Sequence, residues 1–252
     1  MIMRNMPDTK YNRNFIVKVI AALNFAESNA INSETLRNFR EKLGAQFGGL
    51  NEVERSEVLV QNDESGVQSK VISSTYWTIE SIDKIFTLEI QNSAISIVLN
   101  QYINYSDLKP TLDKVFKDFL EEFKEVTEIS RAGLRYINAI KLDGSNTDWT
   151  EYIESELAKH TQITERSKLR RAMSNIVIQQ SEDIYISINA GIYNQYFPGP
   201  IVDNGFTLDI DAFTSTTSAP LSVSDKFVQL NDIATAIFEQ SIKENLRNIL
   251  RS

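Results

Sequence analysis

The sequence predicts an α+β protein with a mainly antiparallel sheet. We expect two related β-rich halves, each followed by a long amphipathic helix that packs on the sheet. Two observations favour this class: segments of alternating apolar residues separated by short turn-rich pieces, and two long apolar stripes at helical spacing. A third is the scarcity of glycine and proline, 9 and 5 among 252 residues, which argues against long linkers.

The first half begins with a strand over residues 14–25, where every second residue is apolar. Asn32 and Ser33 supply an N-cap for a helix over 34–47, which Gly48 and Gly49 end. Turn-rich pieces at 62–66, 81–83 and 91–93 then separate a meander of three or four strands, expected over 52–61, 70–80, 84–91 and 94–100. A long amphipathic helix is expected over 106–126, and its apolar stripe should pack on a sheet.

The second half repeats this order of elements. A strand over 131–142 follows the long helix directly, and a short helix is expected over 146–157. A hairpin of strands 168–180 and 183–195, a loop at 196–205 and a strand at 206–214 come next. A terminal helix then begins at Ser224 and Asp225 and runs close to Leu250. The repetition suggests an internal duplication, with an N-terminal half (1–145), a connection (146–166) and a C-terminal half (167–252), or one compact domain formed by all three.

Composition excludes several classes of function. The net charge of −8 argues against a protein that coats nucleic acid, because such proteins neutralise many phosphates with lysine and arginine. The absence of cysteine excludes disulfides, thiolate zinc sites and cysteine nucleophiles, and the single histidine limits imidazole chemistry. No apolar run is long enough to span a bilayer, and the first residues lack the pattern of a secretion signal. We therefore expect a cytoplasmic protein without membrane contact.

The segment RAGLRYINAIKL, residues 131–142, is the first candidate site. Its alternation places Arg131 and Arg135 on one face, across Gly133. Two readings remain open: the arginines bind one large anionic ligand or a partner, or each pairs with an acid from a neighbouring element. The other face carries the structural motif of Leu134, Tyr136 and Asn138, and we expect Asn138 to lock the strand to a helix.

A basic cluster is the second candidate. If residues 166–171 belong to a strand, Arg166, Lys168 and Arg170 share one face beside Arg171. The cluster is either an anion- or partner-binding surface or a charged edge strand that discourages pairing with other sheets. If this strand adjoined the strand of Arg135, the two arginine clusters would merge into one site.

Other polar groups give weaker signals. Asp209 and Asp211 share a strand face, as carboxylates that hold a divalent cation do, while Asp203 fits a turn. We expect His160 to be solvated. Tyr193, Tyr196 and Phe197 form either an exposed contact patch or a lid on the sheet. Neither a phosphate-binding glycine loop nor a nucleophile elbow is present, so no catalytic residue, metal or cofactor is assigned.

Two short segments resemble a sporadically distributed bacterial family of about 250-residue proteins with no established activity. One is the LRYIN strand, Leu134 to Asn138, and the other is the FExSI pattern of the closing helix, Phe238 to Ile242. Asn231 stands where the family leads us to expect a histidine, Ala139 where a basic residue is common and Lys243 where a hydroxyl residue is expected. The resemblance implies no catalytic mechanism.

These observations favour a non-catalytic cytoplasmic binding or assembly protein, with a protein partner or self-association. The alternative is a nucleic-acid or nucleotide-binding module that uses the arginine-rich face. The third hypothesis is a metal-dependent enzyme that acts through Asp209 and Asp211.

Overall fold

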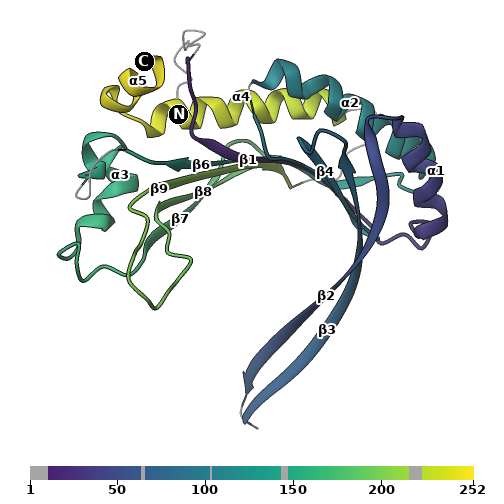
Figure 1. The fold of residues 1–252 in the computed structure, drawn as a ribbon, viewed down its shortest axis with the longest axis horizontal. Helices are drawn as coiled ribbons and strands as arrows, with labels where there is room; N and C mark the ends of the chain where they lie inside the picture. The colour runs from purple at the N-terminus through teal and green to yellow at the C-terminus, as the bar shows by residue number, and fades with distance from the viewer. Residues whose placement is uncertain (1–10, 64–65, 103, 143–146, 216–222) are drawn as a thin grey trace.

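The computed structural model describes residues 11–63, 66–102, 104–142, 147–215 and 223–252, and its strands form one antiparallel sheet of nine (Figure 1). The α+β prediction with a mainly antiparallel sheet is confirmed. The strands lie in the order β2-β3-β4-β5-β1-β6-β9-β8-β7. Their bounds are β1 Ile16–Phe25, β2 Phe47–Asp63, β3 Gly66–Ser81, β4 Phe86–Gln91, β5 Ala94–Leu99, β6 Ile129–Ile140, β7 Ala172–Gln179, β8 Ile184–Ile192 and β9 Phe206–Thr214.

The two halves contribute to this sheet in the same way. In the first half, β1 leads through a helix into the meander β2–β5, and β5 pairs back onto β1. In the second, β6 leads through short helical turns into the meander β7–β9, and β9 pairs back onto β6. The two first strands, β1 and β6, pair with each other at the centre. The repeated element order therefore extends to the strand topology, and both halves share one sheet.

Helices cover one face of the sheet (Figure 1). Their bounds are α1 Ser33–Leu43, α2 Tyr105–Glu122, α3 Ser155–Ala158, α4 Val223–Ser241 and α5 Glu244–Arg251, and 3₁₀ turns cover Trp149–Glu151 and Lys159–Gln162. Long helices bury an apolar stripe against the sheet because burial of a large apolar side chain contributes about 1.5–3 kcal/mol. Phe116 of α2 stacks on Phe227 of α4 with ring centroids 5.1 Å apart, which joins the closing helices of the two halves.

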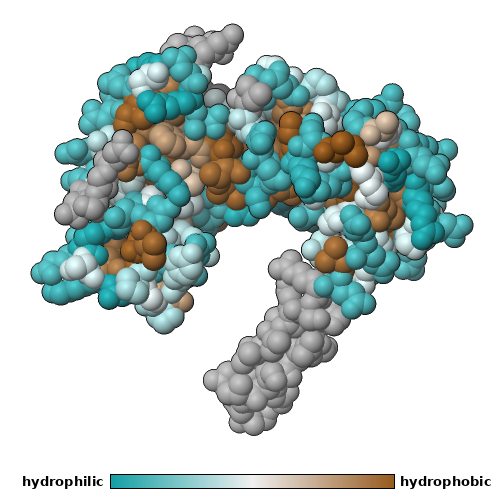
Figure 2. Space-filling view, in the orientation of Figure 1, coloured by the Kyte–Doolittle hydropathy of each residue, from teal (hydrophilic) through white to brown (hydrophobic). Residues whose placement is uncertain are grey.

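The opposite face of the sheet is left open and is concave. Figure 1 shows the sheet arched, with α1, α2, α4 and α5 on its outer side. The β2–β3 hairpin bends away from the body at one end, and the loop between β8 and β9 hangs down at the other. In the space-filling view a hollow lies beneath the middle of the arch (Figure 2). This open face is the largest surface of the sheet that the helices do not cover.

The β2–β3 hairpin extends well beyond its neighbour. β3 pairs with β4 only from Trp77 to Glu80, whereas its pairing with β2 continues to the Asp63–Gly66 pair. The strands are therefore longer than the predicted 52–61 and 70–80. Residues 64 and 65 of the expected turn lie outside the described part of the chain.

Three predicted helices end earlier than expected, and one of them, α2, ends at Glu122 rather than near residue 126. α1 is capped by Asn32 as predicted, but it ends at Leu43 because Gly44 takes the left-handed φ of 90°. The prediction of one continuous terminal helix is wrong. The break after Ser241 is a tertiary effect, since the backbone around Ile242 forms a bridge with Ile153.

Two connecting segments also differ from the prediction. The expected helix over 146–157 is reduced to a 3₁₀ turn and the short α3, while Asn146 lies outside the described residues. Residues 168–171 do not belong to a strand, because β7 begins only at Ala172. Within the described chain, no helix is both long and apolar enough to cross a membrane.

Candidate functional site

Strand β6 presents two chemically different faces, as its alternation predicts. Leu134 is fully buried on the covered face, and the Tyr136 hydroxyl donates a hydrogen bond to Oδ1 of Asn231 on α4 at 2.8 Å. Tyr136 thus fastens the sheet to the helix layer, and burial raises its pKa well above the ordinary value. The expectation for Asn138 is wrong: its amide donates to the carbonyl of Leu208 on β9 at 3.1 Å, so it ties strand to strand.

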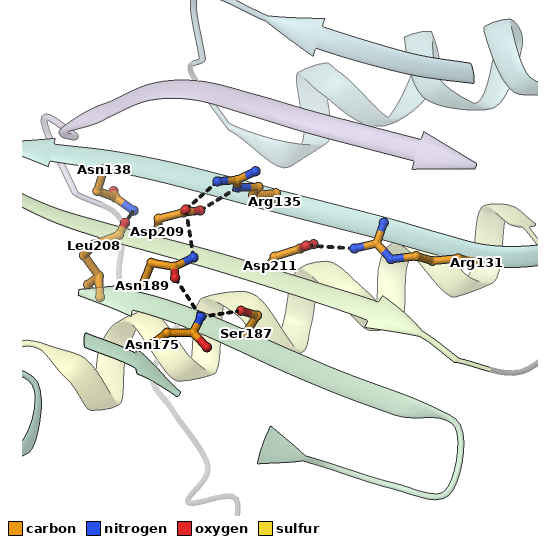
Figure 3. Close-up of polar contacts among 9 residues, drawn as sticks. All are labelled: Arg131, Arg135, Asn138, Asn175, Ser187, Asn189, Leu208, Asp209 and Asp211. Atoms are coloured by element: carbon orange, nitrogen blue, oxygen red, sulfur yellow. Dashed lines mark hydrogen bonds and ion pairs between the residues drawn. The ribbon is translucent and has the colours of Figure 1, made fainter. Parts of the chain in front are cut away.

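The open face of β6 carries an arginine bound by two hydrogen bonds to a buried acid. Arg135 donates from Nε to Oδ1 of Asp209 at 2.7 Å and from Nη2 to Oδ2 at 2.6 Å (Figure 3). The Asp209 side chain is only 7% exposed and that of Arg135 is 40% exposed. The fork geometry matches a carboxylate, and the hydrogen bonds to Asp209 raise the pKa of Arg135 despite its partial burial.

Arg131 makes a second ion pair on the same face. Its Nη2 donates to Oδ2 of Asp211 at 2.7 Å, and its guanidinium carbon lies 4.4 Å from the ring centroid of Phe213. A Cβ added to Gly133 would lie 2.5 Å from the Arg131 guanidinium. The glycine between the two arginines therefore leaves room for Arg131 to lie flat across the strand and reach β9.

Neither arginine lies directly opposite its acid in the β6–β9 pair. Arg135 lies opposite Asp211 and reaches its diagonal neighbour Asp209, which is opposite Ile137. Arg131 lies beyond the Gly133–Phe213 pair and reaches back over Gly133 to Asp211. The two arginines are thus matched by two aspartates, and the second of the two readings of Arg131 and Arg135 describes their contacts. The sequence alone did not specify which acids these would be.

The ion pairs continue into a hydrogen-bonded row that crosses four strands (Figure 3). Asn189 on β8 donates to Oδ2 of Asp209 at 3.2 Å. Asn175 on β7 donates to Oδ1 of Asn189 at 2.7 Å and to the hydroxyl of Ser187 at 3.3 Å. We call Arg135, Asp209, Asn189 and Asn175 the polar row. It connects the centre of the sheet to its β7 edge.

Sequence reasoning missed Asn175 and Asn189. Part of their signal was present in the alternation, because Asn189 follows Tyr185 and Ser187 on one strand face, and Asn175 shares a face with Gln179. Only the register, which places Asn175 opposite Asn189 and Asn189 opposite Asp209, brings them together.

Burial acts on the second acid of the open face. Asp211 has a raised pKa because burial disfavours its charged form, and the charge of Asp209 adds to this effect. The guanidiniums of Arg131 and Arg135 act in the opposite direction but do not cancel it. The open face therefore holds two acids of β9 close to the two arginines of β6.

The basic cluster of residues 166–171 lies apart from these arginines. β7, which follows the cluster, is separated from β6 by β9 and β8, so the condition for one merged site is not met. The shared strand face proposed for Arg166, Lys168 and Arg170 is wrong, because these residues precede the strand in turns.

Each member of the cluster has a separate local environment. Arg166 is half-buried and donates to Oδ1 of Asn204 at 2.9 Å, and Lys168 lies 3.0 Å from the carboxylate of Glu165. Arg170 donates to the carbonyls of Ser167 and Leu169. The cluster therefore does not act through one shared array of side chains.

Arg171 is surrounded by the aromatic loop between β8 and β9. Its guanidinium carbon lies 5.1 Å from the ring centroids of both Tyr193 and Phe197. These rings are 54% and 56% exposed, and Tyr196 is 59% exposed, so the loop presents a contact patch to solvent. The buried Asn194 holds the loop, since its amide donates to the carbonyls of Arg170 and Gly199.

The remaining candidates have structural partners. Asp203 accepts a hydrogen bond from the backbone of Gly205 and pairs with Lys141, as expected for a turn. His160 is half-buried rather than solvated, and its Nε2 lies 3.2 Å from the carbonyl of Ala172. Among the described residues, no three histidines or acids are grouped as a metal site would require.

No protein-family model matches the chain, and no curated protein shows a significant match.

Proposed function

We propose that this chain is a non-catalytic binding and assembly protein, and that its open sheet face receives a protein partner. The observation that carries the proposal is the polar row with its neighbouring Arg131–Asp211 pair on a concave surface. Hydrogen bonds within the row fix the orientation of its groups, while Arg135 stays partly exposed and Asn175 exposed. Preorganised polar groups of this kind favour recognition of a polar protein surface.

The distribution of charge supports a protein partner over a polyanion. A protein that tracks phosphates needs guanidiniums free of other anions, because its affinity comes from neutralising phosphate charge. Arg131 and Arg135 are each bound to an aspartate, and Glu80 and Glu89 lie exposed on β3 and β4 of the same sheet. The same ion pairs disfavour an enzyme acting through Asp209 and Asp211, since carboxylate oxygens that would bind a cation already accept hydrogen bonds from arginine.

A matched pair of tryptophan variants tests the proposal. Ser96 is a half-buried residue of β5 that lies beside Ala22 of β1 and Glu89 of β4, and a tryptophan there would obstruct the open face. Lys117 on α2 is 72% exposed and lies on the opposite side of the sheet. We expect S96W to lose a protein that the wild-type chain captures from its native cell extract, whereas K117W retains it. Equal capture by all three proteins would contradict the proposal.

A labelled oligonucleotide distinguishes the alternative function. We expect no change in its fluorescence anisotropy with the wild-type protein at low salt. The double variant Asp209→Asn, Asp211→Asn releases both guanidiniums and should gain salt-sensitive binding. Tight, salt-sensitive binding by the wild-type chain would instead favour the nucleic-acid module.

A further inference from the structure

The two edges of the sheet differ in how they are protected from pairing with other strands. The β2 edge carries the exposed acids Glu52 and Glu54, and its register with β3 is interrupted between Phe47 and Leu50. Charges and bulges are devices that prevent edge-to-edge pairing. β7, with the sequence AMSNIVIQ, has neither a charged residue nor a proline, and its register with β8 is uninterrupted.

The side chains of β7 are also incompletely covered. Val177 is 58% exposed on the open face, and Ile176 and Ile178 are only partly buried on the other. α4, the long helix of this half, packs against β6 and β9. An uncharged strand with exposed apolar side chains at the edge of a sheet is a ready template for pairing.

The hydrogen-bond pattern shows which backbone groups are available. The N–H of Gln180 donates to the carbonyl of Ile184, which fixes the even-numbered residues of β7 as those bonded to β8. The N–H and C=O groups of the odd-numbered residues therefore point outward from the sheet. These residues are Met173, Asn175, Val177 and Gln179, and no strand lies beyond them in the described part of the chain.

We propose that two copies of this chain join through the outer edges of their β7 strands, antiparallel and with the twofold axis at Ile176, so that one sheet runs through both copies. Two identical strands that pair antiparallel are related by a twofold axis, so β7 of one copy can pair with β7 of another. In this register Val177 lies opposite Asn175 of the second copy, and Met173 lies opposite Gln179. All four outward-facing residues then exchange their backbone hydrogen bonds.

Charge complementarity favours a second copy of this chain as the partner of β7, and it selects the register of the β7–β7 pair. β7 is preceded by the exposed Arg170 and followed by the exposed Glu182. Arg170 binds only backbone carbonyls among the described residues. With the axis at Ile176, Arg170 of each copy lies opposite Glu182 of the other. The uncharged strand between them is a place where two copies of a protein of net charge −8 can approach without repulsion.

The alternation of inward- and outward-pointing N–H groups along β7 allows a direct test. Val177→Pro removes an N–H that points out of the monomer's sheet, and proline is tolerated at such positions of an edge strand. We expect light scattering after size exclusion to give about twice 28.7 kDa for the wild-type chain and the monomer mass for V177P, with unchanged circular dichroism. If V177P fails to fold, V177K applies the same test through charge repulsion.

Two further variants test the register. The chain has no cysteine, so Ile176→Cys should give a disulfide-linked dimer on oxidation, because residues facing each other without hydrogen bonds have Cα atoms about 4.5 Å apart. Asn51→Cys on the other edge, at β2, is the control and should give no disulfide-linked dimer. Arg170→Glu and Glu182→Arg should each weaken the dimer about two- to fivefold, and the double reversal should restore it.

Several outcomes would overturn the proposal. If the wild-type chain stays monomeric across a range of concentrations, β7 does not pair with a second copy. Its edge could then pair only with a strand of a different protein. A dimer that V177P and V177K leave intact, or that Asn51→Cys cross-links and Ile176→Cys does not, would place the interface elsewhere.

Discussion

The two faces of strand β6 are built from alternate residues of one short segment, yet their side chains are satisfied in different ways. On the covered face Leu134 is enclosed by the core, and Tyr136 is bound to the helix layer. On the open face Arg131 and Arg135 are bound to aspartates of the adjacent strand, and their guanidiniums remain partly exposed. The covered face depends on close packing, whereas the open face depends on charge matching.

This difference predicts which substitutions should affect stability and which should affect recognition. Apolar contacts in a close-packed interior are costly to remove because the cavity fills only in part. Ion pairs with one exposed partner contribute much less, because water replaces part of what is lost. Truncation of a buried apolar side chain on the covered face should therefore cost the most free energy of unfolding, whereas loss of partner binding should be greatest for substitutions on the open face.

Leu134→Ala on the covered face should give the largest effect. Leu134 is 0% exposed, and the free energy of unfolding should fall by about 3 kcal/mol. Urea denaturation followed by circular dichroism measures this loss. A loss below about 1 kcal/mol would mean that the covered face is not closely packed.

Asp209→Ala should give the next largest effect. It removes a buried carboxylate and leaves Arg135 and Asn189 without their acceptor, so we expect a loss of about 2 kcal/mol. Asp211→Ala is the matched control on the same strand face, and it should cost less because Asp211 binds Arg131 through a single hydrogen bond. Equal losses in the same urea titration would contradict the distinction between the two ion pairs.

Tyr136→Phe removes the hydroxyl that joins the sheet to the helix layer. It keeps the ring against Tyr102 but removes the hydrogen bonds of this hydroxyl with Asn231 and with Tyr102, so the expected loss is about 1 kcal/mol. Asn231→Ala combined with it in a double-mutant cycle should show that the two losses are not additive. Additive losses would mean that the bond does not contribute to stability.

Asp211→Asn should have the smallest effect and one that changes with pH. The folded-state pKa of Asp211 is raised, so its protonated form is favoured by folding. Its contribution to stability is fully present below the unfolded pKa and is lost as pH rises through the folded pKa. The free energy of unfolding of the variant, relative to that of the wild type, should therefore be higher at pH 7 than at pH 4. Urea denaturation at both pH values checks this, and the opposite trend would mean that the ion pair with Arg131 outweighs burial.

Local patterns in the sequence were sufficient for much of this fold. Strand β9 has the predicted bounds, 206–214, because its alternation is regular and a turn precedes it. The two faces of β6 and the cap at Asn32 were also predictable, since they depend on neighbouring residues alone.

Features that depend on distant parts of the chain could not be predicted. The break between α4 and α5 results from backbone hydrogen bonds between residues 152–154 and 241–243. The same holds for the candidate site: alternation placed Asp209 and Asp211 on one face and the arginines on one face, but only the β6–β9 pairing joins them. A strand order of this kind is a property of the whole sheet.

The most direct test of the open face as a binding surface is site-specific photo-crosslinking in living cells. A photoreactive phenylalanine analogue replaces Ser96 on the open face in one strain and Lys117 on α2 in another. We predict that irradiation yields a discrete protein adduct from position 96 and none from position 117. An adduct from position 117 alone, no adduct from position 96, or a nuclease-sensitive adduct would contradict the account.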